Sequence, residues 1–331
     1  MLKKMTSLRN SNGGFWLSTL LPATATALFY YRHPWLYLLL LVAVVPAADA
    51  LIGQDVGVTN QKASQAPSVP VVPVTYICVW GAAVLVALER AMSARQLEFA
   101  GLVIASGIVS AFAMAHIHEV MHRGGRRFRL ISDVALAVAG YPHYRVVHQL
   151  HHGHVGDPRF GSTAHIGLSV WCHVGRSFFS ALRSAIAYEL GQIHSWRESR
   201  LLQIVPVSIA VVALFAWTGG WRGVVFYVGQ GIVSVFVVEA VGYLQHYGLC
   251  GSTDELGNQV AWDINFWLSN RLFVNNGLHT HHHLEQTRAY DHLVHAGRAL
   301  PGGYLHMFGL ALIPPLWFSV MNQRLPVKCL A

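Results

Sequence analysis

Long apolar stretches separated by short polar breaks fill the first third of this chain and return after residue 200. Each stretch approaches the roughly 20 residues that a helix needs to cross a bilayer. There are six, at residues 15–31, 35–52, 71–90, 99–119, 201–218 and 222–245. Because few charged residues interrupt them, the pattern predicts transmembrane helices.

The breaks between these stretches group them in pairs. Arg32–Pro34 separates the first two, a short polar stretch near Glu89–Glu98 separates the next two, and Thr218–Trp221 separates the last two. Short connections of this kind join neighbouring antiparallel helices. The expected fold is an all-α integral membrane protein with about six transmembrane helices in three hairpins, and residues 1–331 form one domain.

Basic residues outside the spans predict the orientation of the chain. The net charge is +8, although only 11% of the residues are charged. Ten arginines lie between the fourth and fifth spans: Arg123, Arg126, Arg127, Arg129, Arg145, Arg159, Arg176, Arg183, Arg197 and Arg200. Others lie near the two ends: Lys3, Lys4, Arg9, Arg271, Arg288, Arg298, Arg324 and Lys328. An excess of Lys and Arg marks the cytoplasmic side. We therefore expect a cytoplasmic N-terminus and cytoplasmic segments 122–200 and 246–331, and no binding of nucleic acid.

The cysteines exclude several classes of protein. Cys78, Cys172, Cys250 and Cys329 are far apart, and no two form a CxxC pair. This argues against a disulfide framework, a zinc ribbon or a fused iron–sulfur electron carrier.

Histidines cluster at the predicted cytoplasmic ends of the spans. The chain has 20 of them. His118 and His122 are four residues apart where a predicted helix ends, so both imidazoles share one helix face and suit one metal centre. The same residues also match HExxH, which is typical of zinc proteases. This first cluster is therefore ambiguous by itself.

Three further clusters favour a larger metal site in a cytoplasmic helical cap. His148–His152 and His279–His283 both contain an HxxHH pattern, and His246 ends the sixth predicted span. The candidate ligands are His118, His122, His148, His151, His152, His246, His279, His282 and His283. A zinc ion ordinarily takes four ligands, so nine imidazoles can serve two metals. Imidazole suits iron, copper, zinc and nickel, so the ligand type leaves the metal open.

The remaining histidines lack this spacing. His116 should point away from the His118–His122 face, and His143, His154 and His281 are candidates for supporting the ligands. We expect structural roles for the others: His33, His165, His173, His194, His292, His295 and His306.

The boxes HxxxH, HxxHH and HxxHH, in this order between paired spans, resemble the integral-membrane fatty acid desaturase and hydroxylase superfamily. Finer features are similar to its alkane 1-monooxygenase branch, which includes xylene monooxygenases. These features are P-x-x-D-x-x-x-G-x-D at residues 46–55, Asp157-Pro158, the HYGL element at residues 246–249, Thr287-Arg288 and Tyr290. The resemblance covers roughly residues 40–295.

The resemblance implies that the nine candidate histidines bind two non-haem iron ions and that O₂ is a co-substrate. His281 occupies a place that the family usually gives to aspartate. The resemblance also implies an apolar substrate, such as an alkane, an alkyl chain or an alkylbenzene, taken from the membrane lipid. Electrons would come from a rubredoxin- or ferredoxin-type donor with its reductase. The location would be the bacterial inner membrane, with a cytoplasmic active site.

The sequence also departs from the branch at two places. The second box is HxxHH where the branch usually has HxxxHH, which is closer to desaturases. Gln245 stands where the branch usually has glutamate before HYGL, and Glu239 is a candidate to compensate. Five acids are candidates to orient imidazoles and to offset the metal charge: Glu119, Asp157, Glu239, Asp263 and Glu285.

Two other functions remain open. The short second box favours a desaturase, or a related oxidative enzyme that acts on a fatty acyl group. A histidine-rich metal transporter is the third alternative, but it would need polar groups through the depth of the membrane, and here the histidines gather at one face. The apolar run 305–321 contains Pro314-Pro315 and is expected to cap the bundle instead of crossing the membrane.

Overall fold

The computed structural model describes residues 12–56, 70–193, 195, 197–249 and 261–326. Helices dominate this part of the chain. Their order is η1 (Asn12–Thr19), α2 (Leu20–Tyr30), α3 (Pro34–Leu39), the π-helical turn η2 (Leu40–Val44), α4 (Val45–Ile52), α5 (Val71–Ser93), α6 (Gln96–Met121), α7 (Arg126–Val138), α8 (Tyr144–Gly153), η4 (Pro158–Phe160), α9 (Val170–Gln192), α10 (Arg200–His246), α11 (Trp267–Leu272), α12 (His279–Leu284), η5 (Tyr290–His292), α13 (Tyr304–Ala311), α14 (Pro314–Met321) and η6 (Asn322–Arg324). Two short strands, β1 (Trp262–Asp263) and β2 (Arg298–Ala299), pair in parallel, which the all-α prediction did not include.

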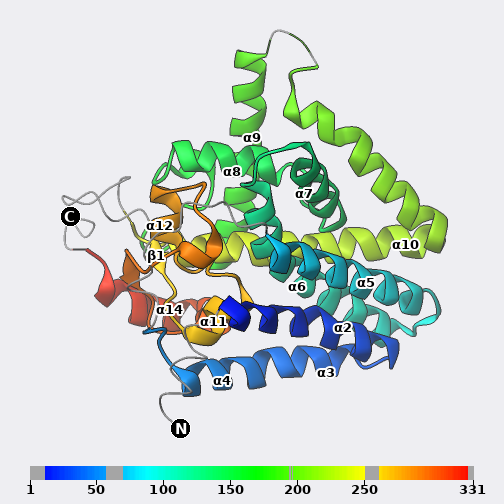
Figure 1. Ribbon diagram of the computed structural model, residues 1–331, viewed down its shortest axis with the longest axis horizontal. Helices are drawn as coiled ribbons and strands as arrows, with labels where there is room; N and C mark the ends of the chain where they lie inside the picture. Colours follow the sequence, from blue (N-terminus) through cyan, green and yellow to red (C-terminus); the bar gives the residue numbers. More distant parts are fainter. Residues whose placement is uncertain (1–11, 57–69, 194, 196, 250–260, 327–331) are drawn as a thin grey trace.

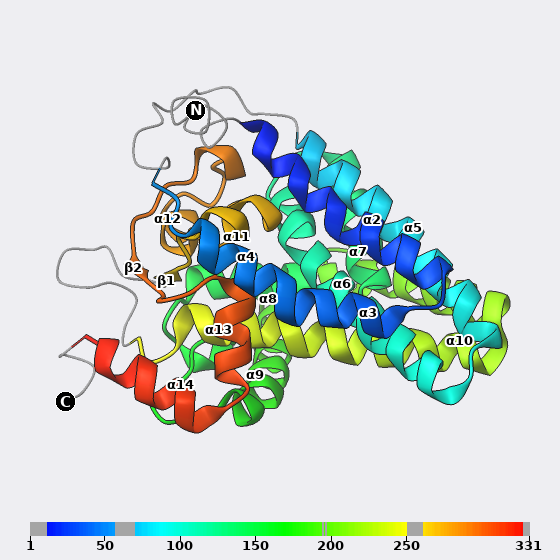
Figure 2. The ribbon, with the colours of Figure 1, turned by 90° about the horizontal axis from the view of Figure 1, so that it is seen from below.

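Helices α2, α3, α5 and α6 run alongside one another and form a bundle, and α8, α11 and α12 gather at one end of it (Figures 1 and 2). Helix α6 lies at the centre, where it packs against α3, α5 and α10. Its buried residues include Leu102, Ala105 and Val109. Gly107 lets α10 approach closely, because a Cβ atom there would lie 2.5 Å from the Cβ of Val233.

Among the described residues, four helical segments are long and apolar enough to cross a membrane: Pro34–Ile52, Val71–Ser93, Gln96–Met121 and Arg200–His246. They identify the chain as an integral membrane protein. They overlap five of the six predicted spans, since α10 covers two of them. The first predicted span, 15–31, is divided between η1 and α2, so the number of six spans stays a prediction.

Helix α10 has two limbs that meet at a kink (Figure 1). We call residues 200–219 the first limb and residues 221–246 the second limb. Between them, Gly220 has φ 56° and ψ −143°, a backbone conformation that favours glycine. This break falls inside the predicted turn Thr218–Trp221. The second limb packs along α6, whereas the first limb leans away from the bundle (Figure 1).

Two aspartates of the motif at residues 46–55 connect α4 to α11. Asp49 accepts hydrogen bonds from the backbone N–H and the hydroxyl of Ser269, at 3.1 and 2.6 Å. Asp55 forms a buried ion pair with Arg271, with 3.2 Å between the atoms. These contacts tie the N-terminal part of the chain to the histidine-bearing end of the bundle.

Helices α13 and α14 occupy the apolar run 305–321 and are bent relative to each other by 118°. Their predicted capping role stays a prediction. Some residues of the sequence analysis lie outside the described part of the chain: Lys3, Lys4, Arg9, His194, Cys250, Lys328 and Cys329.

Candidate metal centre

Five imidazoles converge where α6, α8 and α12 meet. This first group consists of His118, His122, His148, His152 and His282. One ring nitrogen of each lies within 4.8 Å of the others. The Nε2 of His148 is 2.8 Å from the Nε2 atoms of His118 and His152, and the Nε2 atoms of His152 and His282 are 3.0 Å apart.

Four more imidazoles form a second group beside the first. They are His151, His246, His279 and His283, and their closest ring nitrogens also lie within 4.8 Å of one another. The ring centroids of His152 and His283, one from each group, are 4.5 Å apart. The structure thus brings together all nine histidines that the sequence singled out, in two neighbouring groups.

A shared cation explains this convergence better than hydrogen bonds among imidazoles. A neutral imidazole carries only one N–H, so it can satisfy one neighbouring nitrogen as a donor. The Nε2 of His148 faces three other Nε2 atoms at 2.8–3.2 Å, and one proton cannot serve all three contacts. Both ring nitrogens of His151 are buried, with no hydrogen-bond partner among the residues that the structure describes. The donor set therefore fits a non-haem iron site.

Burial keeps these imidazoles in the neutral form that binds a metal. Burial lowers the pKa of His151 to about 4. Burial, together with neighbouring imidazoles, lowers the pKa of His148 and His282 well below its ordinary value. Near neutral pH these rings offer lone pairs, and they need no proton release to accept a cation.

Helix periodicity divides each histidine box between the two groups. On α8, His148 and His152 are four residues apart and enter the first group, whereas His151 enters the second. On α12, His279 and His283 are four residues apart and enter the second group, whereas His282 enters the first. Each short helix therefore presents ligands to both groups from two faces.

Asp263 on β1 supports α12 and through it both groups. Its carboxylate accepts a hydrogen bond from the Thr280 N–H at 2.8 Å, in the first turn of α12. It also accepts from the backbone N–H groups of Ala296 and Gly297, at 2.9 and 2.8 Å, and it lies 2.9 Å from the His295 Nδ1. Asp263 is fully buried. It contacts the backbone of the ligand helix and no ligand ring.

Replacing Asp263 by Ala is expected to lower the free energy of unfolding by about 3 kcal/mol, because it leaves several buried N–H donors without an acceptor. Since these donors include the first turn of α12, we also expect less bound iron. Asp157→Ala is the matched control, since that carboxylate bonds only within its own loop. Thermal unfolding and metal analysis of both variants test this, and equal iron loss in the two variants would contradict it.

Two other candidate acids are buried but make no contact with a ligand imidazole. Glu119 pairs with Arg123 and accepts a hydrogen bond from the Tyr290 N–H at 3.3 Å. Glu239 accepts a hydrogen bond from the Tyr141 hydroxyl. Gln245 donates to the Tyr304 hydroxyl at 2.8 Å. Glu239 was predicted to replace the carboxylate that is lost where Gln245 stands. Because Glu239 contacts Tyr141, its effect on a ligand ring would have to pass through Tyr141.

The remaining supporting candidates lie away from the ligand rings. Asp157 pairs with Arg159 at 2.6 Å in a partly exposed loop, and Glu285 is exposed and pairs with Arg288. Salt bridges with nearby arginines hold both carboxylates, and Glu285 also lies 3.4 Å from the His281 Nε2. That these two acids orient ligand imidazoles stays a prediction. The ring of His143 contacts Tyr141 and Phe178, and its support of a ligand stays a prediction.

His154, His281 and His116 also lie outside both groups. His154 stacks on Phe160 and lies 2.9 Å from the Leu150 carbonyl, so it supports no ligand ring. His281 accepts a hydrogen bond from the Val294 N–H at 2.8 Å. His116 stacks on Tyr76, as its predicted position on another helix face requires.

One neighbour of the metal centre was not found by sequence reasoning. The Tyr144 ring stacks on His148, with 5.3 Å between centroids. Tyr144 begins α8 and lies one turn before His148. The i, i+4 spacing of these two residues in the sequence could therefore have predicted their contact.

An apolar cavity of about 240 Å³ leads to both groups. Leu38, Leu41 and Val42 line one part of it, and Ile108, Ala111 and Ala115 line the α6 side. Its polar end reaches His118, His148, His151 and His279. A chain-like apolar molecule in this cavity would have one end beside the imidazoles.

The sequence profile of the fatty acid desaturase family matches residues 97–314, which is more than half of the chain. The chain therefore belongs to the fatty acid desaturase family. Within it, the chain is 28% identical to alkane 1-monooxygenase 1 of Pseudomonas aeruginosa, over 88% of this chain and 84% of that protein. It is 28% identical to an alkane 1-monooxygenase of Acinetobacter baylyi, over 85% and 74%. It is 24% identical to the hydroxylase component of the xylene/toluene monooxygenase of Pseudomonas putida, over 69% and 64%. The resemblance to the alkane monooxygenase branch is confirmed.

Proposed function

We propose that the chain is a membrane-bound non-haem di-iron monooxygenase that hydroxylates an apolar substrate with O₂. The observation that carries this proposal is the apolar cavity that ends at the two groups of imidazoles. The first group would hold one iron ion and the second group the other. The similarity to alkane and xylene/toluene monooxygenases supports the same reaction.

Iron supplies the redox chemistry with O₂ that amino-acid side chains lack. The residues of this chain have the other tasks. Nine neutral imidazoles would hold the metals, and Asp263 keeps α12 in place. The leucines, valines and Phe112 of the cavity wall would bind the substrate chain and exclude water.

The substrate would enter from the lipid. Val42 lines the cavity and is 72% exposed, so the cavity wall extends to the outer surface of the bundle. An alkane, an alkyl chain or an alkylbenzene has the apolar surface that suits this route. The wall offers few polar groups to a substrate, and Glu239 and Gln245 are two of them.

The electrons would come from a separate protein, because the sequence contains no CxxC pair for a carrier of its own. We propose a rubredoxin- or ferredoxin-type donor with its reductase. The arginines between the fourth and fifth predicted spans would favour an acidic donor through electrostatic steering. They also support a cytoplasmic active site in a bacterial inner membrane, with the N-terminus on the same side.

Labelled oxygen tests the reaction directly. Cells that produce the protein with a rubredoxin and its reductase are supplied with alkanes, alkylbenzenes and fatty acids under ¹⁸O₂. We expect an alcohol that carries the label, because a monooxygenase transfers one oxygen atom to the product and the other to water. A host with the His282→Ala variant is the control.

A desaturase is the second candidate, and the short box His148–His152 favours it. In that case the labelled-oxygen experiment gives an alkene or an unsaturated fatty acid without label. That result would overturn the hydroxylase proposal and keep the iron site.

A further inference from the structure

A second cavity, of about 280 Å³, lies beside the metal centre between the end of α6, α7, α8 and the first turn of α10. Four arginines line it, Arg123, Arg129, Arg145 and Arg200, and among the described residues Asp133 is the only carboxylate in its wall. His122 of the first imidazole group also lines it.

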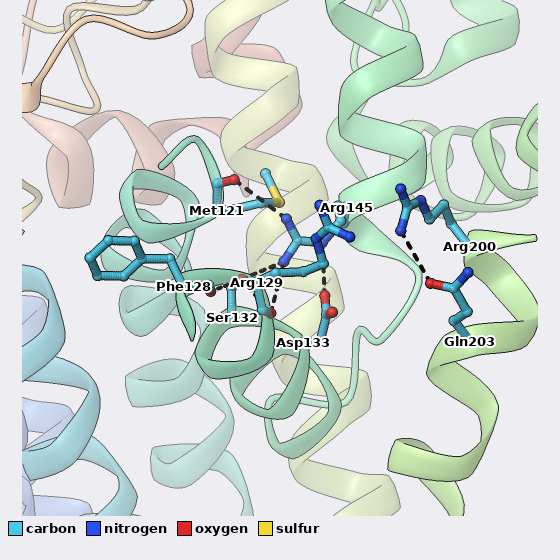
Figure 3. Close-up of polar contacts among 8 residues, drawn as sticks. All are labelled: Met121, Phe128, Arg129, Ser132, Asp133, Arg145, Arg200 and Gln203. Atoms are coloured by element: carbon cyan, nitrogen blue, oxygen red, sulfur yellow. Dashed lines mark hydrogen bonds and ion pairs between the residues drawn. The ribbon is translucent and has the colours of Figure 1, made fainter. Parts of the chain in front are cut away.

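Two of the four arginines already have carboxylate partners. Arg145 donates to Asp133 at 2.7 Å and to the backbone carbonyls of Arg129 and Met121 at 3.2 and 3.4 Å, and it also contacts Ser132 (Figure 3). These contacts hold α7 against α8. Arg123 pairs with Glu119. The negative charge of Asp133 is therefore already used inside the cavity wall.

Arg129 and Arg200 provide positive charge that no carboxylate neutralises in the described part of the chain. Arg200 donates to the side-chain oxygen of Gln203 at 3.1 Å, which is a neutral partner (Figure 3). The guanidinium group of Arg129 has no hydrogen-bond or ion-pair partner among the described residues. The cavity thus presents two guanidinium groups that suit an anion, and phosphate is the anion whose geometry arginine matches best.

The start of α10 is fixed in place, which keeps Arg200 at the cavity. The buried carboxylate of Glu189 accepts hydrogen bonds from the backbone N–H groups of Arg200 and Leu201, at 2.8 and 3.2 Å, and from the Ser199 hydroxyl. Because Glu189 is occupied by these donors, it does not pair with the Arg200 side chain. Arg200 is therefore positioned before any ligand binds.

The surfaces next to this cavity are apolar and exposed. Leu130 and Val134 of α7 are 59% and 40% exposed, and on the first limb of α10 Val205 and Ile209 are 45% and 63% exposed. The first limb, whose first residues line the cavity, leans away from the bundle (Figure 1). A positive cavity with apolar surfaces beside it matches an amphiphile that carries a phosphate group and acyl chains. A free phosphate ion would leave these apolar surfaces uncovered.

We propose that this cavity binds the phosphate group of an anionic phospholipid from the membrane leaflet on the side of the metal centre. The acyl chains lie along α7 and the first limb of α10. The headgroup contacts Arg129 and Arg200, and it covers the cavity wall that His122 shares. The bound lipid connects the first limb to α7.

Lipid titration of the purified full-length protein tests the proposal. Phosphatidylglycerol, phosphatidylcholine or inorganic phosphate is added to the delipidated protein in mild detergent, and thermal unfolding is followed. We expect phosphatidylglycerol to raise the Tm by roughly 3 °C or more. The two other additives are expected to have much smaller effects. This readout does not depend on turnover, so it stands apart from the proposed monooxygenase activity.

Arginine variants locate the effect. The double variant Arg129→Gln with Arg200→Gln is expected to lose the phosphatidylglycerol shift. Arg183→Gln, which changes an exposed arginine of α9 outside the cavity, is expected to keep it. The single variant Arg200→Gln, whose side chain bonds only to Gln203, is expected to lose most of the shift if the double variant does not fold. Arg145 is left intact because its bonds hold α7 and α8 together.

Several results would overturn the proposal. A phosphatidylglycerol shift that is absent from the wild type, or that survives in the variants, would show that the cavity binds no lipid. An equal shift with inorganic phosphate would define a small-anion site. If the variants instead kept the lipid shift and lost binding to an acidic electron-donor protein, the cavity would be a protein-docking site.

Discussion

Replacing His279 or His282 on α12 by Ala is expected to abolish turnover and to lower the iron content, whereas His281→Ala is expected to keep most of both. His279 belongs to the second imidazole group and His282 to the first. His281, between them, accepts a hydrogen bond from the Val294 N–H and faces Glu285. Even the loss of a residue that only supports a ligand costs 10- to 100-fold in metal affinity or activity, so we expect losses above roughly a hundredfold in turnover for the two ligand variants.

Iron analysis of the purified variants and product yield in the labelled-oxygen assay provide the measurements. Each ligand variant is expected to keep part of its iron, because one group stays intact in each case. The three substitutions lie on one short helix, so His281→Ala controls for damage to α12 itself. If His281→Ala lost as much iron as His282→Ala, the two groups would not be the metal sites that we propose.

The sequence predicted the members of the metal centre because helix spacing is a local property. The pairs His118 with His122, and His279 with His283, are four residues apart, and each pair enters one group. Which other histidines join each pair depends on how α6, α8, α10 and α12 meet in space. No spacing in one helix contains that information, so the placement of His282 with His152, and of His279 with His151, had to come from the structure.

The supporting residues were harder to predict because their partners are distant in the sequence. Asp49 contacts Ser269, and Asp55 contacts Arg271, across more than 200 residues. The motif at residues 46–55 pointed to both aspartates but not to these partners. Asp157 has a local partner instead, since Arg159, two residues away, holds its carboxylate. Its role beside an imidazole stays a prediction.

The membrane helices were predicted well where apolar length alone defines an element. The predicted spans 71–90 and 99–119 lie inside α5 and α6. The predicted break at Thr218–Trp221 is present as the kink at Gly220. The direction in which the first limb of α10 leaves the bundle could not be predicted, because hydropathy does not distinguish a side that faces protein from one that faces lipid.

Replacing Ala111 by Phe is expected to restrict the enzyme to shorter substrate chains, while the iron content stays unchanged. Ala111 lines the apolar cavity and precedes His118 by seven residues on α6, which places it roughly 10 Å along the helix from the imidazoles. A phenyl ring there would fill the part of the cavity that only a long chain reaches. Overfilling a packed site costs about 1–3 kcal/mol, so turnover of long alkanes should fall roughly tenfold or more.

Short substrates separate this effect from general damage. They end before Ala111, so their turnover should change much less than that of long alkanes. Leu85→Phe is the matched control, because Leu85 is 59% exposed on α5 and lies outside the cavity. The measurement compares product yields over a series of alkanes of increasing length, together with the iron content of each variant. Equal losses for every chain length would contradict a blocked channel and indicate a disturbed metal centre, because only a blocked channel discriminates by length. Unchanged turnover of every alkane would mean that the substrate reaches the metals by another route.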